Sequence, residues 1–277
     1  MLSVLFSSSM HETLSRRLAV GWVCFDSRPE RMMLIMRVVE AVWEKRNLGV
    51  TCIEMEIGKQ DAVPDIEQVI SERTEQYQVA KVSAGNVAAV FALQKHGFQF
   101  IETLFQTEIS LEKRPEPPEL YRKLQLDAGY HTASDSEQEA AIAQILRGDI
   151  FSTDRVALDP VFSHALSARR NALWAQDALT GKNAAMIITE YRGQNVGFNI
   201  LADKGSYCDG LLGGLFAEFQ NTGTGFANVY SALNAAHDMG AKKMISHVSS
   251  NNFQMYKLHL LYGMRVTHMT YNLVKHC

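Results

Sequence analysis

The chain has 277 residues, of which 47% are hydrophobic and 21% are charged, and its formal net charge is −3 at pH 7. This composition is typical of globular proteins, and the length corresponds to about two domains. Proteins that bind nucleic acid usually carry a basic surplus, and a membrane-spanning helix needs an apolar run of about 20 residues, so we expect neither a nucleic-acid partner nor a membrane span.

Up to residue 112, the spacing of apolar residues predicts a mixture of strands and helices. Alternation predicts strands over Ala19–Phe25, Val50–Ile57, Tyr77–Val82, Phe98–Leu104 and Thr107–Leu111. Helical spacing predicts helices over Pro29–Arg46 and Asn86–His96, and Gly97 ends the second of them. The run from Lys113 to Glu119 holds three prolines among charged residues, which neither a helix interior nor a central strand tolerates. We therefore predict a linker over residues 113–126 between two domains, 1–112 and 127–277.

The second half is also predicted to mix strands and helices. Helices are expected over Ser136–Leu146, Arg169–Leu179, Phe226–Met239 and Asn252–Tyr262. Strands are expected over Ala185–Glu190, Val196–Ala202, Gly210–Phe219, Met244–Val248 and Val266–Val274. The first two of these strands are joined by a hairpin turn over residues 191–195. Together the two halves predict an α/β fold with a mixed (α+β) sheet covered by helices.

Two segments, one in each half, share a pattern that suggests an internal repeat. In each, a strand ends, an asparagine begins a helix, and a glycine ends that helix eleven positions later: Asn86 and Gly97, then Asn252 and Gly263 (97 − 86 = 263 − 252 = 11). Asparagine is a favoured N-cap, and glycine is favoured directly after a helix. The matching spacing favours a duplication over two unrelated units of the same kind.

The most informative stretch is the loop that precedes the helix expected from Phe226. It consists of Phe219, Gln220, Asn221, Thr222, Gly223, Thr224 and Gly225. Glycines let the backbone turn sharply and approach a ligand, while the start of a helix presents free amides and the positive end of the helix dipole. These features suit a pyrophosphate. The loop is neither a P-loop nor a G-x-G-x-x-G motif, and a simple tight turn is the alternative interpretation.

The spacing Gln220-x-x-Gly223-x-Gly225 resembles the Q/R-x-x-G-x-G/A motif of the GNAT N-acetyltransferase superfamily. The segment from Val248 to Asn252, with His259 and Gly263-Met264 after it, lies where that superfamily usually has V-x-x-x-N…Y…G-F. The resemblance implies acetyl-CoA as co-substrate, held by residues 219–225 and by Asn252. The four cysteines show no paired spacing of the kind found in zinc sites, so we expect no metal.

The first half resembles the truncated first domain of the dTDP-fucosamine acetyltransferases. The similar stretch runs from Ala80 through Asn86 to Gly97-Phe98 and Glu102-Thr103, and it lacks the glycine loop. This resemblance implies two tandem GNAT-like domains, the N-terminal one truncated and unable to bind acetyl-CoA. It also implies attack of an amine on the thioester, which requires removal of a proton from the amine and a donor for the leaving thiolate.

Several side chains are candidates for this chemistry. His259 lies where the superfamily usually has the tyrosine that protonates the thiolate, and Tyr256 shares its helical face, so either ring is a candidate acid. Glu218 is a candidate base, although a solvated glutamate at the end of a strand is the commoner case. Arg155 and Arg169, followed by Arg170, are candidates to bind the phosphates of an acceptor, or else are ordinary surface arginines.

The expected function is transfer of an acetyl group to a small-molecule amine, for example an amino-sugar nucleotide. Two alternatives stay open: a non-catalytic protein that binds acyl-CoA, which the absent tyrosine favours, and an aminoacyl transferase of tandem GNAT type. The four cysteines lie far apart, as in a cytoplasmic protein with reduced thiols. A homodimer is a further possibility that the sequence does not decide.

Overall fold

A computed structural model describes residues 36–277, and the predicted strand Ala19–Phe25 and the start of the helix predicted from Pro29 lie outside that range. The first half contains β1 (Arg37–Glu40), α2 (Val42–Leu48), β2 (Cys52–Ile57), α3 (Val63–Ser71), β3 (Tyr77–Ser83), α4 (Val87–Lys95) and β4 (Gln99–Ser110). The short helices η1 (Glu119–Tyr121) and η2 (Leu124–Asp127) follow over the predicted linker, which η2 exceeds by one residue.

The second half begins with β5 (Ala128–Thr132), α5 (Asp135–Leu146), α6 (Arg155–Leu158) and α7 (His164–Thr180). It continues with β6 (Ala184–Tyr191), β7 (Gln194–Asp203), β8 (Cys208–Leu215), η3 (Ala217–Phe219) and α8 (Gly225–Asp238). It ends with β9 (Lys243–Ser249), α9 (Phe253–Leu261) and β10 (Arg265–His276). The described strands form one mixed sheet in the order β1-β2-β3-β10-β4-β9-β8-β7-β6-β5, which confirms the predicted fold class.

Two predictions about the first half are wrong in detail. Part of the helix predicted over Pro29–Arg46 is the strand β1, in which Val39 lies opposite Glu54 of β2. Two adjacent β-branched residues, Val38 and Val39, favour a strand where a sheet edge is available for pairing. The two strands predicted on either side of residues 105–106 are the single strand β4, because both of its edges are paired along most of its length.

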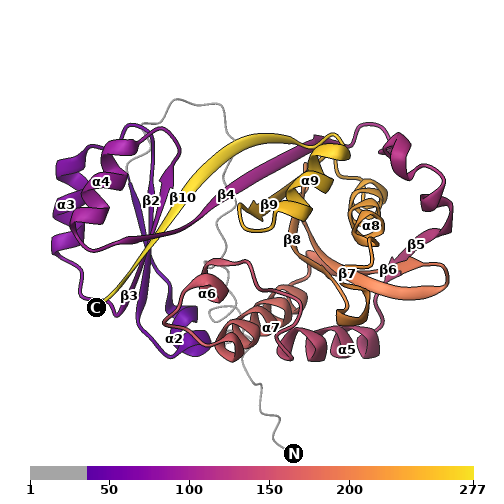
Figure 1. Ribbon diagram of the computed structural model, residues 1–277, viewed down its shortest axis with the longest axis horizontal. Coiled ribbons are helices and arrows are strands. Elements are labelled where there is room, and N and C mark those ends of the chain that lie inside the picture. Colours follow the sequence, from indigo (N-terminus) through magenta and orange to yellow (C-terminus); the bar gives the residue numbers. More distant parts are fainter. Residues whose placement is uncertain (1–35) are drawn as a thin grey trace, which may run out of the picture.

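The two halves exchange their last strands. β4, which ends the first half, lies between β10 and β9, while β10, which ends the chain, lies between β3 and β4. Figure 1 shows these two long strands crossing the middle of the molecule side by side. They run antiparallel, with Thr270 opposite Leu104 near their centres. Each half is therefore completed by a strand from the other, and the sheet is continuous across them.

The internal repeat is visible in the bounds of these elements. β3 and β9 are both seven residues long, and β4 and β10 are both twelve; each pair is offset by 166 positions (243 − 77 = 265 − 99 = 166). The helix between them is capped in the same way in both halves. The Asn86 side chain accepts a hydrogen bond from the Ala89 amide, and the Asn252 side chain accepts one from the Met255 amide.

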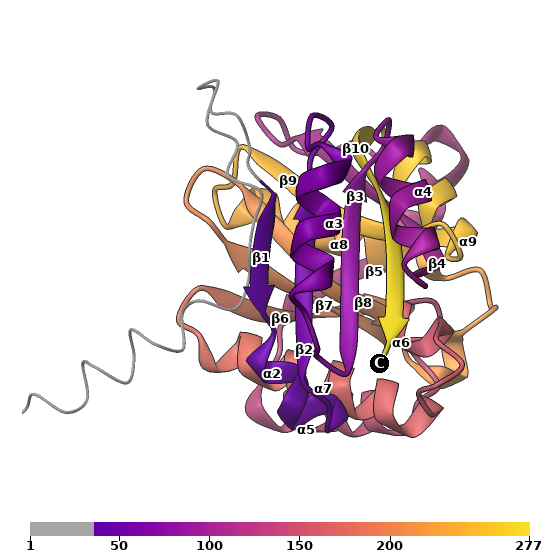
Figure 2. The same cartoon turned by 90° about the vertical axis from the view of Figure 1, so that its left-hand side faces the viewer.

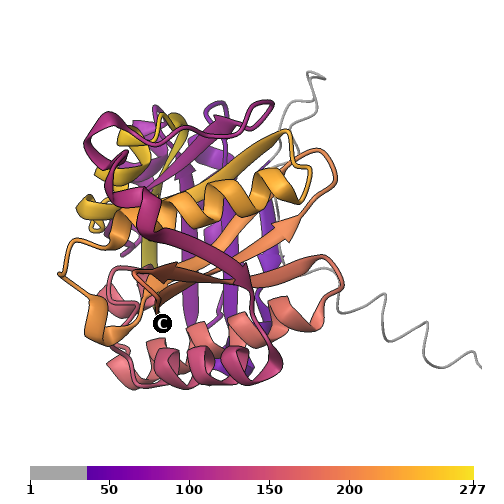
Figure 3. The ribbon, with the colours of Figure 1, turned by 90° about the vertical axis from the view of Figure 1, so that its right-hand side faces the viewer.

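Helices cover both faces of the sheet. In the first half, α3 and α4 pack on one face around Ile53, Ile66 and Leu93, as Figure 2 shows from that side. In the second half, α8 packs on one face, and α5 and α7 pack on the other (Figure 3). α2, α6 and α7 lie together along the lower side of Figure 1. None of the helices within residues 36–277 combines the length and apolar character needed to cross a membrane.

Candidate active site

A large cavity of about 1680 Å³ lies where the two halves meet. Residues of β3, β4, β8, β9 and β10 line it, together with residues of α6, α7, α8 and α9. Both faces of β9 contribute, since Ser246 and Val248 line the cavity as well as His247 and Ser249. Successive residues of a strand point to opposite faces of a sheet, so the cavity extends through the sheet beside β9.

The sheet opens between β8 and β9. These parallel strands pair over only three positions, from Cys208 opposite Met244 to Gly210 opposite Ser246, although β8 continues to Leu215 and β9 to Ser249. The corresponding parallel pair of the first half, β2 and β3, is paired along all of β2, from Cys52 to Ile57. The gap that lets the cavity pass through the sheet therefore exists in the second half alone among the described strands.

A β-bulge lies at the point where the two strands part. Ile200 of β7 is opposite Leu212 and Leu201 is opposite Gly210, so Leu211 is an extra residue in β8. A bulge leaves backbone groups unpaired and bends its strand. Here it lies directly after Gly210, the last residue that pairs with β9, and Leu211 lines the cavity. The bulge thus places backbone polar groups at the edge of the opening.

The loop of residues 219–225 connects β8 and η3 to the start of α8. Asn221 and Gly223 have positive φ angles of 59° and 84°, which turn the chain sharply and account for the glycine. The hydroxyl of Thr222 donates a hydrogen bond to the Phe219 carbonyl oxygen at 2.6 Å. No side chain caps α8, so the amides of its first turn are available to an anion. Gly225 has a packing role as well, because a Cβ there would lie 3.0 Å from Leu258.

The equivalent loop of the first half, residues 58–62 between β2 and α3, lines the cavity, but hydrogen bonds from its own and neighbouring side chains hold it together. The Gly58 amide donates a hydrogen bond to the Asp61 carboxylate at 2.7 Å, so a carboxylate already lies near the start of α3. Asn86 Nδ2 donates to the carbonyl oxygens of Gly58 and Asp61, at 2.9 and 3.1 Å, and ties this loop to the end of β3. Within residues 36–277, the side-chain nitrogen of its counterpart Asn252 donates no hydrogen bond to the loop before α8, and Asn252 lines the cavity.

The two candidate acids on α9 differ in their surroundings. His259 lines the cavity but is only 6% exposed, and its Nδ1 shares a hydrogen bond with Thr107 Oγ1 at 2.9 Å. Burial lowers the pKa of His259 to about 4, so the ring is neutral near pH 7, and the candidate acid is not in its imidazolium form. Tyr256 does not line the cavity; its ring packs against Phe105, with the ring centroids 4.8 Å apart.

The neutral state of His259 has a measurable consequence for stability. The folded-state pKa of about 4 lies below the unfolded value of about 6.5, so the unfolded chain binds the proton more readily between these values. Stability should therefore fall as the pH falls from 6.5 to 4, by about 3 kcal/mol from this residue alone. The free energy of unfolding, measured by chemical denaturation between pH 4 and pH 6.5, should depend clearly less on pH in His259→Leu than in the wild type. The same slope in both proteins would contradict the assignment.

The other candidate residues lie away from the cavity or are engaged within the protein. Glu218 is an exposed residue of η3 and does not line the cavity. Arg169 is exposed on α7, where its guanidinium donates a hydrogen bond to the Arg46 carbonyl oxygen. Arg155 does line the cavity, but its guanidinium pairs with Glu44 at 3.1 Å and with Glu54 at 2.5 Å. The interpretation of these arginines as ligands for acceptor phosphates therefore has no support from the geometry.

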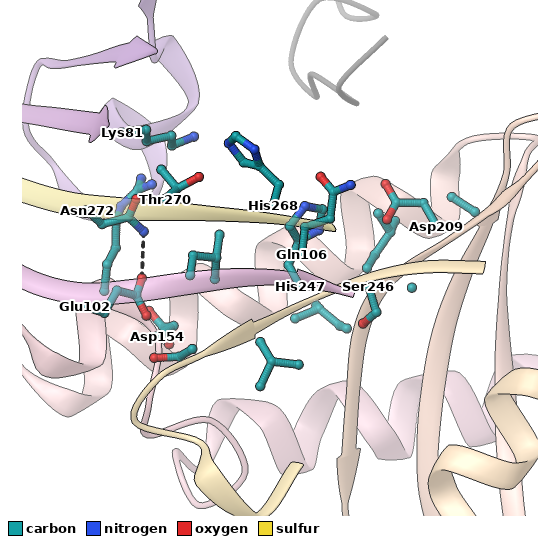
Figure 4. A pocket seen from close by; sticks show the side chains of 18 of the residues that line it. Lys81, Glu102, Gln106, Asp154, Asp209, Ser246, His247, His268, Thr270 and Asn272 are labelled. Atoms are coloured by element: carbon teal, nitrogen blue, oxygen red, sulfur yellow. Dashed lines mark hydrogen bonds between the residues drawn. The ribbon is translucent and has the colours of Figure 1, made fainter. Parts of the chain in front are cut away.

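Sequence reasoning missed a row of polar side chains across β3, β10, β4 and β9. Figure 4 shows its members around the cavity: Lys81, Thr270, Asn272, His268, Glu102, Gln106 and His247. The internal repeat is the signal that could have found them, since the offset of 166 positions relates His247 to Lys81 and His268 to Glu102. The framework of the cavity is therefore symmetric, whereas its chemistry differs from one half to the other.

His247 is the member of this row nearest to the opening between β8 and β9. It follows Ser246, the last residue of β9 that pairs with β8, and lies opposite Gln106 of β4. The side chain of His247 is exposed to the open cavity, and the surrounding walls lower its pKa by partly removing water; Asp209 opposes this effect, and the positive charge of Lys81 and the neighbouring ring of His268 add to it. A neutral imidazole that faces a cavity is a suitable proton acceptor at neutral pH.

Comparisons with known proteins find similarity in structure only. No protein-family model and no curated protein matches the sequence. A GCN5-related N-acetyltransferase from Sphaerobacter thermophilus is 15% identical with a TM-score of 0.51; the match covers 72% of this chain and 59% of that chain, so this chain spans less than two thirds of that protein. A GCN5-related N-acetyltransferase from Kribbella flavida is 14% identical with a TM-score of 0.51, over 81% of each chain.

A conserved protein of unknown function from Staphylococcus epidermidis is similar to the same degree. It is 14% identical with a TM-score of 0.55, and the match covers 82% of this chain and 84% of that one. Identities this low establish the architecture and not the activity. The chain has the fold of the GCN5-related (GNAT) N-acetyltransferases.

Proposed function

We propose that this protein is an acyltransferase that moves an acetyl group from acetyl-CoA to a primary amine bound in the cavity. The observation that carries the proposal is the parting of β8 from β9 after Gly210 and Ser246. Residues 219–225, the loop suited to a pyrophosphate, do not line the cavity themselves, but α8, which begins at the end of that loop, lines it from Asn228 onwards. A CoA molecule bound at the start of α8 could therefore extend through the gap to a second substrate in the cavity. The first half has the same framework, but its strands are paired and its loop is closed.

The residues around the gap fit acetyl-CoA. In the proposal the pyrophosphate is bound by the loop of residues 219–225 and the first amides of α8, where the helix dipole favours negative charge. The pantetheine arm then passes between β8 and β9, whose facing backbone groups are unpaired beyond Gly210 and Ser246 and can bond to its amides. Asn252, at the start of α9, faces the same space.

When bound, acetyl-CoA supplies an activated thioester beside the cavity. In the proposed reaction, His247 removes a proton from the attacking nitrogen as the new C–N bond forms. The backbone at the Leu211 bulge offers an amide to the carbonyl oxygen, which gains negative charge as the nitrogen attacks. As the C–S bond breaks, its electron pair stays on sulfur, and this thiolate takes a proton from solvent, because neither Tyr256 nor a charged His259 is available in the cavity.

The direct test is a panel of amines incubated with acetyl-CoA, with release of free thiol as the readout. It should include monoamines, diamines and an amino-sugar nucleotide, the acceptor that the sequence suggests. Turnover with at least one amine is the expected result. Saturable CoA binding without turnover on any amine would favour the non-catalytic alternative. Salt-dependent binding of charged tRNA would favour the aminoacyl transferase.

The loop assignment predicts that a negative charge at Thr222 weakens CoA binding. Thr222 is exposed and lies three residues before α8, so Thr222→Glu should fold normally, since an acidic residue near the start of a helix is favourable. The same carboxylate should repel the pyrophosphate and raise the dissociation constant of CoA by about tenfold or more. Isothermal titration calorimetry measures this constant directly.

The matched control is Thr222→Gln, which also removes the hydroxyl that bonds to Phe219 but adds no charge. It should bind CoA nearly as well as the wild type. Titration of the wild type should saturate at one CoA per chain, because the Asp61 carboxylate occupies the corresponding loop of the first half. Equal affinity in the Glu and Gln variants, or a second site of similar affinity, would contradict this assignment.

A further inference from the structure

The wall of the cavity formed by β4 and β10 contains buried oxygen atoms without hydrogen-bond donors. Glu102 of β4 is 3% exposed, and its Oε1 accepts a hydrogen bond from Asn272 Nδ2 of β10 at 2.9 Å (Figure 4). No hydrogen bond is formed by Glu102 Oε2 or by Asn272 Oδ1, although Asn272 is only 2% exposed. The hydroxyl of Ser249 is a nearby donor that lowers the pKa of Glu102. Buried polar atoms are nearly always paired, so two neighbouring unpaired acceptors indicate a donor that comes from a ligand.

The neighbouring cations are already paired with other carboxylates. Lys81 lies 2.6 Å from Glu54, Arg155 pairs with both Glu44 and Glu54, and Arg170 pairs with Glu44 at 2.8 Å. Glu102 forms no ion pair with any residue in the described range, 36–277. The chain itself therefore does not supply the positive charge that a carboxylate in this position would attract.

A second carboxylate, that of Asp154, lies on the same side of the cavity as Glu102 (Figure 4). Asp154 accepts hydrogen bonds from the first amides of α6 and from the side chains of Ser167 and Asn171, none of which is charged. Two carboxylates that lack a cationic partner make this end of the cavity favourable for a positive group and unfavourable for a phosphate.

We propose that Glu102 and Asn272 bind a second, cationic amino group of the acceptor, so that the substrate class is a diamine or polyamine. This inference rests on the proposed acyl transfer and specifies its acceptor. The ammonium group offers three donors, which suit the two unpaired oxygens. Burial raises the pKa of Glu102, and a bound cation opposes that effect because it favours the carboxylate form. A sugar nucleotide would instead bring phosphates towards carboxylates.

The register of the sheet sets the length of this acceptor. His247 lies opposite Gln106, and Glu102 is four residues further along β4 on the same face. Four residues of a strand span about 13 Å. The reacting nitrogen and the cationic nitrogen should therefore be about 13 Å apart or slightly less in an extended acceptor.

The experiment compares α,ω-diamines of increasing length with monoamines of the same length, using acetyl-CoA and the full chain. We expect kcat/KM for the diamine that spans this distance to exceed that of its monoamine by about 10- to 100-fold, the usual worth of a hydrogen bond to a charged group. Glu102→Gln keeps the shape but removes the charge, and should abolish the preference. Glu108→Gln, on the same strand but outside the cavity, is the matched control and should preserve it.

A calorimetric titration of the protein with the diamine, in the absence of acetyl-CoA, tests this inference separately from the proposed function. Diamine binding that is lost in Glu102→Gln would support the subsite even if no amine were acetylated. The inference would be overturned by equal kcat/KM for diamines and monoamines, by a preference for the amino-sugar nucleotide, or by a Glu102→Gln protein that binds the diamine as well as the wild type. The dependence on diamine length in the wild type decides the question if the variant fails to fold.

Discussion

Replacing His247 with alanine should lower kcat by about 10²- to 10⁴-fold, the range that a general base usually contributes, and should leave CoA affinity nearly unchanged. The physical reason is that His247 faces the cavity beside the opening between β8 and β9, and its lowered pKa keeps the ring neutral near pH 7. A base that acts mainly in the transition state affects turnover far more than binding. Steady-state kinetics with the best amine of the panel, together with calorimetry for CoA, measure both quantities.

The pH dependence makes the assignment specific. Because the pKa of His247 lies below 6.5, activity in the wild type should fall only in acid, as the ring gains a proton and ceases to accept one. That acidic limb should disappear in His247→Ala, and added imidazole should restore part of the rate. His96→Ala, which removes a histidine directly after α4 and outside the cavity, is the control and should behave as the wild type. If kcat is unchanged in His247→Ala, His247 is not the base, and solvent removes the proton from the amine.

Removing the charge of Glu44 should destabilise the fold by about 3–5 kcal/mol, because it would leave buried guanidinium groups without a full counter-charge. Glu44 is fully buried on α2, and its carboxylate pairs with Arg155 of α6 and Arg170 of α7, at 3.1 and 2.8 Å. The residue thus joins the two halves of the chain behind the wall of the cavity. Denaturant unfolding of Glu44→Gln should show this loss directly.

The matched control for this prediction is an exposed glutamate in an ion pair. Glu119 pairs with Arg122 at 2.7 Å, and both side chains are largely exposed. Pairs of that kind contribute at most about 1 kcal/mol, so Glu119→Gln should leave the free energy of unfolding nearly unchanged. If the two variants unfold at the same denaturant concentration, the ion pairs of Glu44 with Arg155 and Arg170 do not stabilise the fold as proposed.

Local pattern in the sequence was enough to predict most elements of the fold and one end of the candidate site. Alternation located β3 and β9, and the asparagine and glycine at equal spacing indicated a repeat, which agrees with the matching lengths of β4 and β10. The glycine loop before α8 was also predictable. Its sharp turn requires the positive φ angle of Gly223, and that requirement is visible in a single stretch of residues.

Only the tertiary structure decided how the two halves are joined and which side chains face the cavity. The exchange of β4 and β10 pairs residues about 170 positions apart, such as Glu102 and Asn272, and no local periodicity encodes such a pairing. The same holds for the roles of His259 and His247. Helical spacing placed His259 near the reaction but gave no measure of its burial against Thr107, which keeps it neutral, whereas His247 became a candidate base only when β8 and β9 were seen to part beside it. Burial and charge at a site depend on what other segments bring to it, and that is a property of the folded chain.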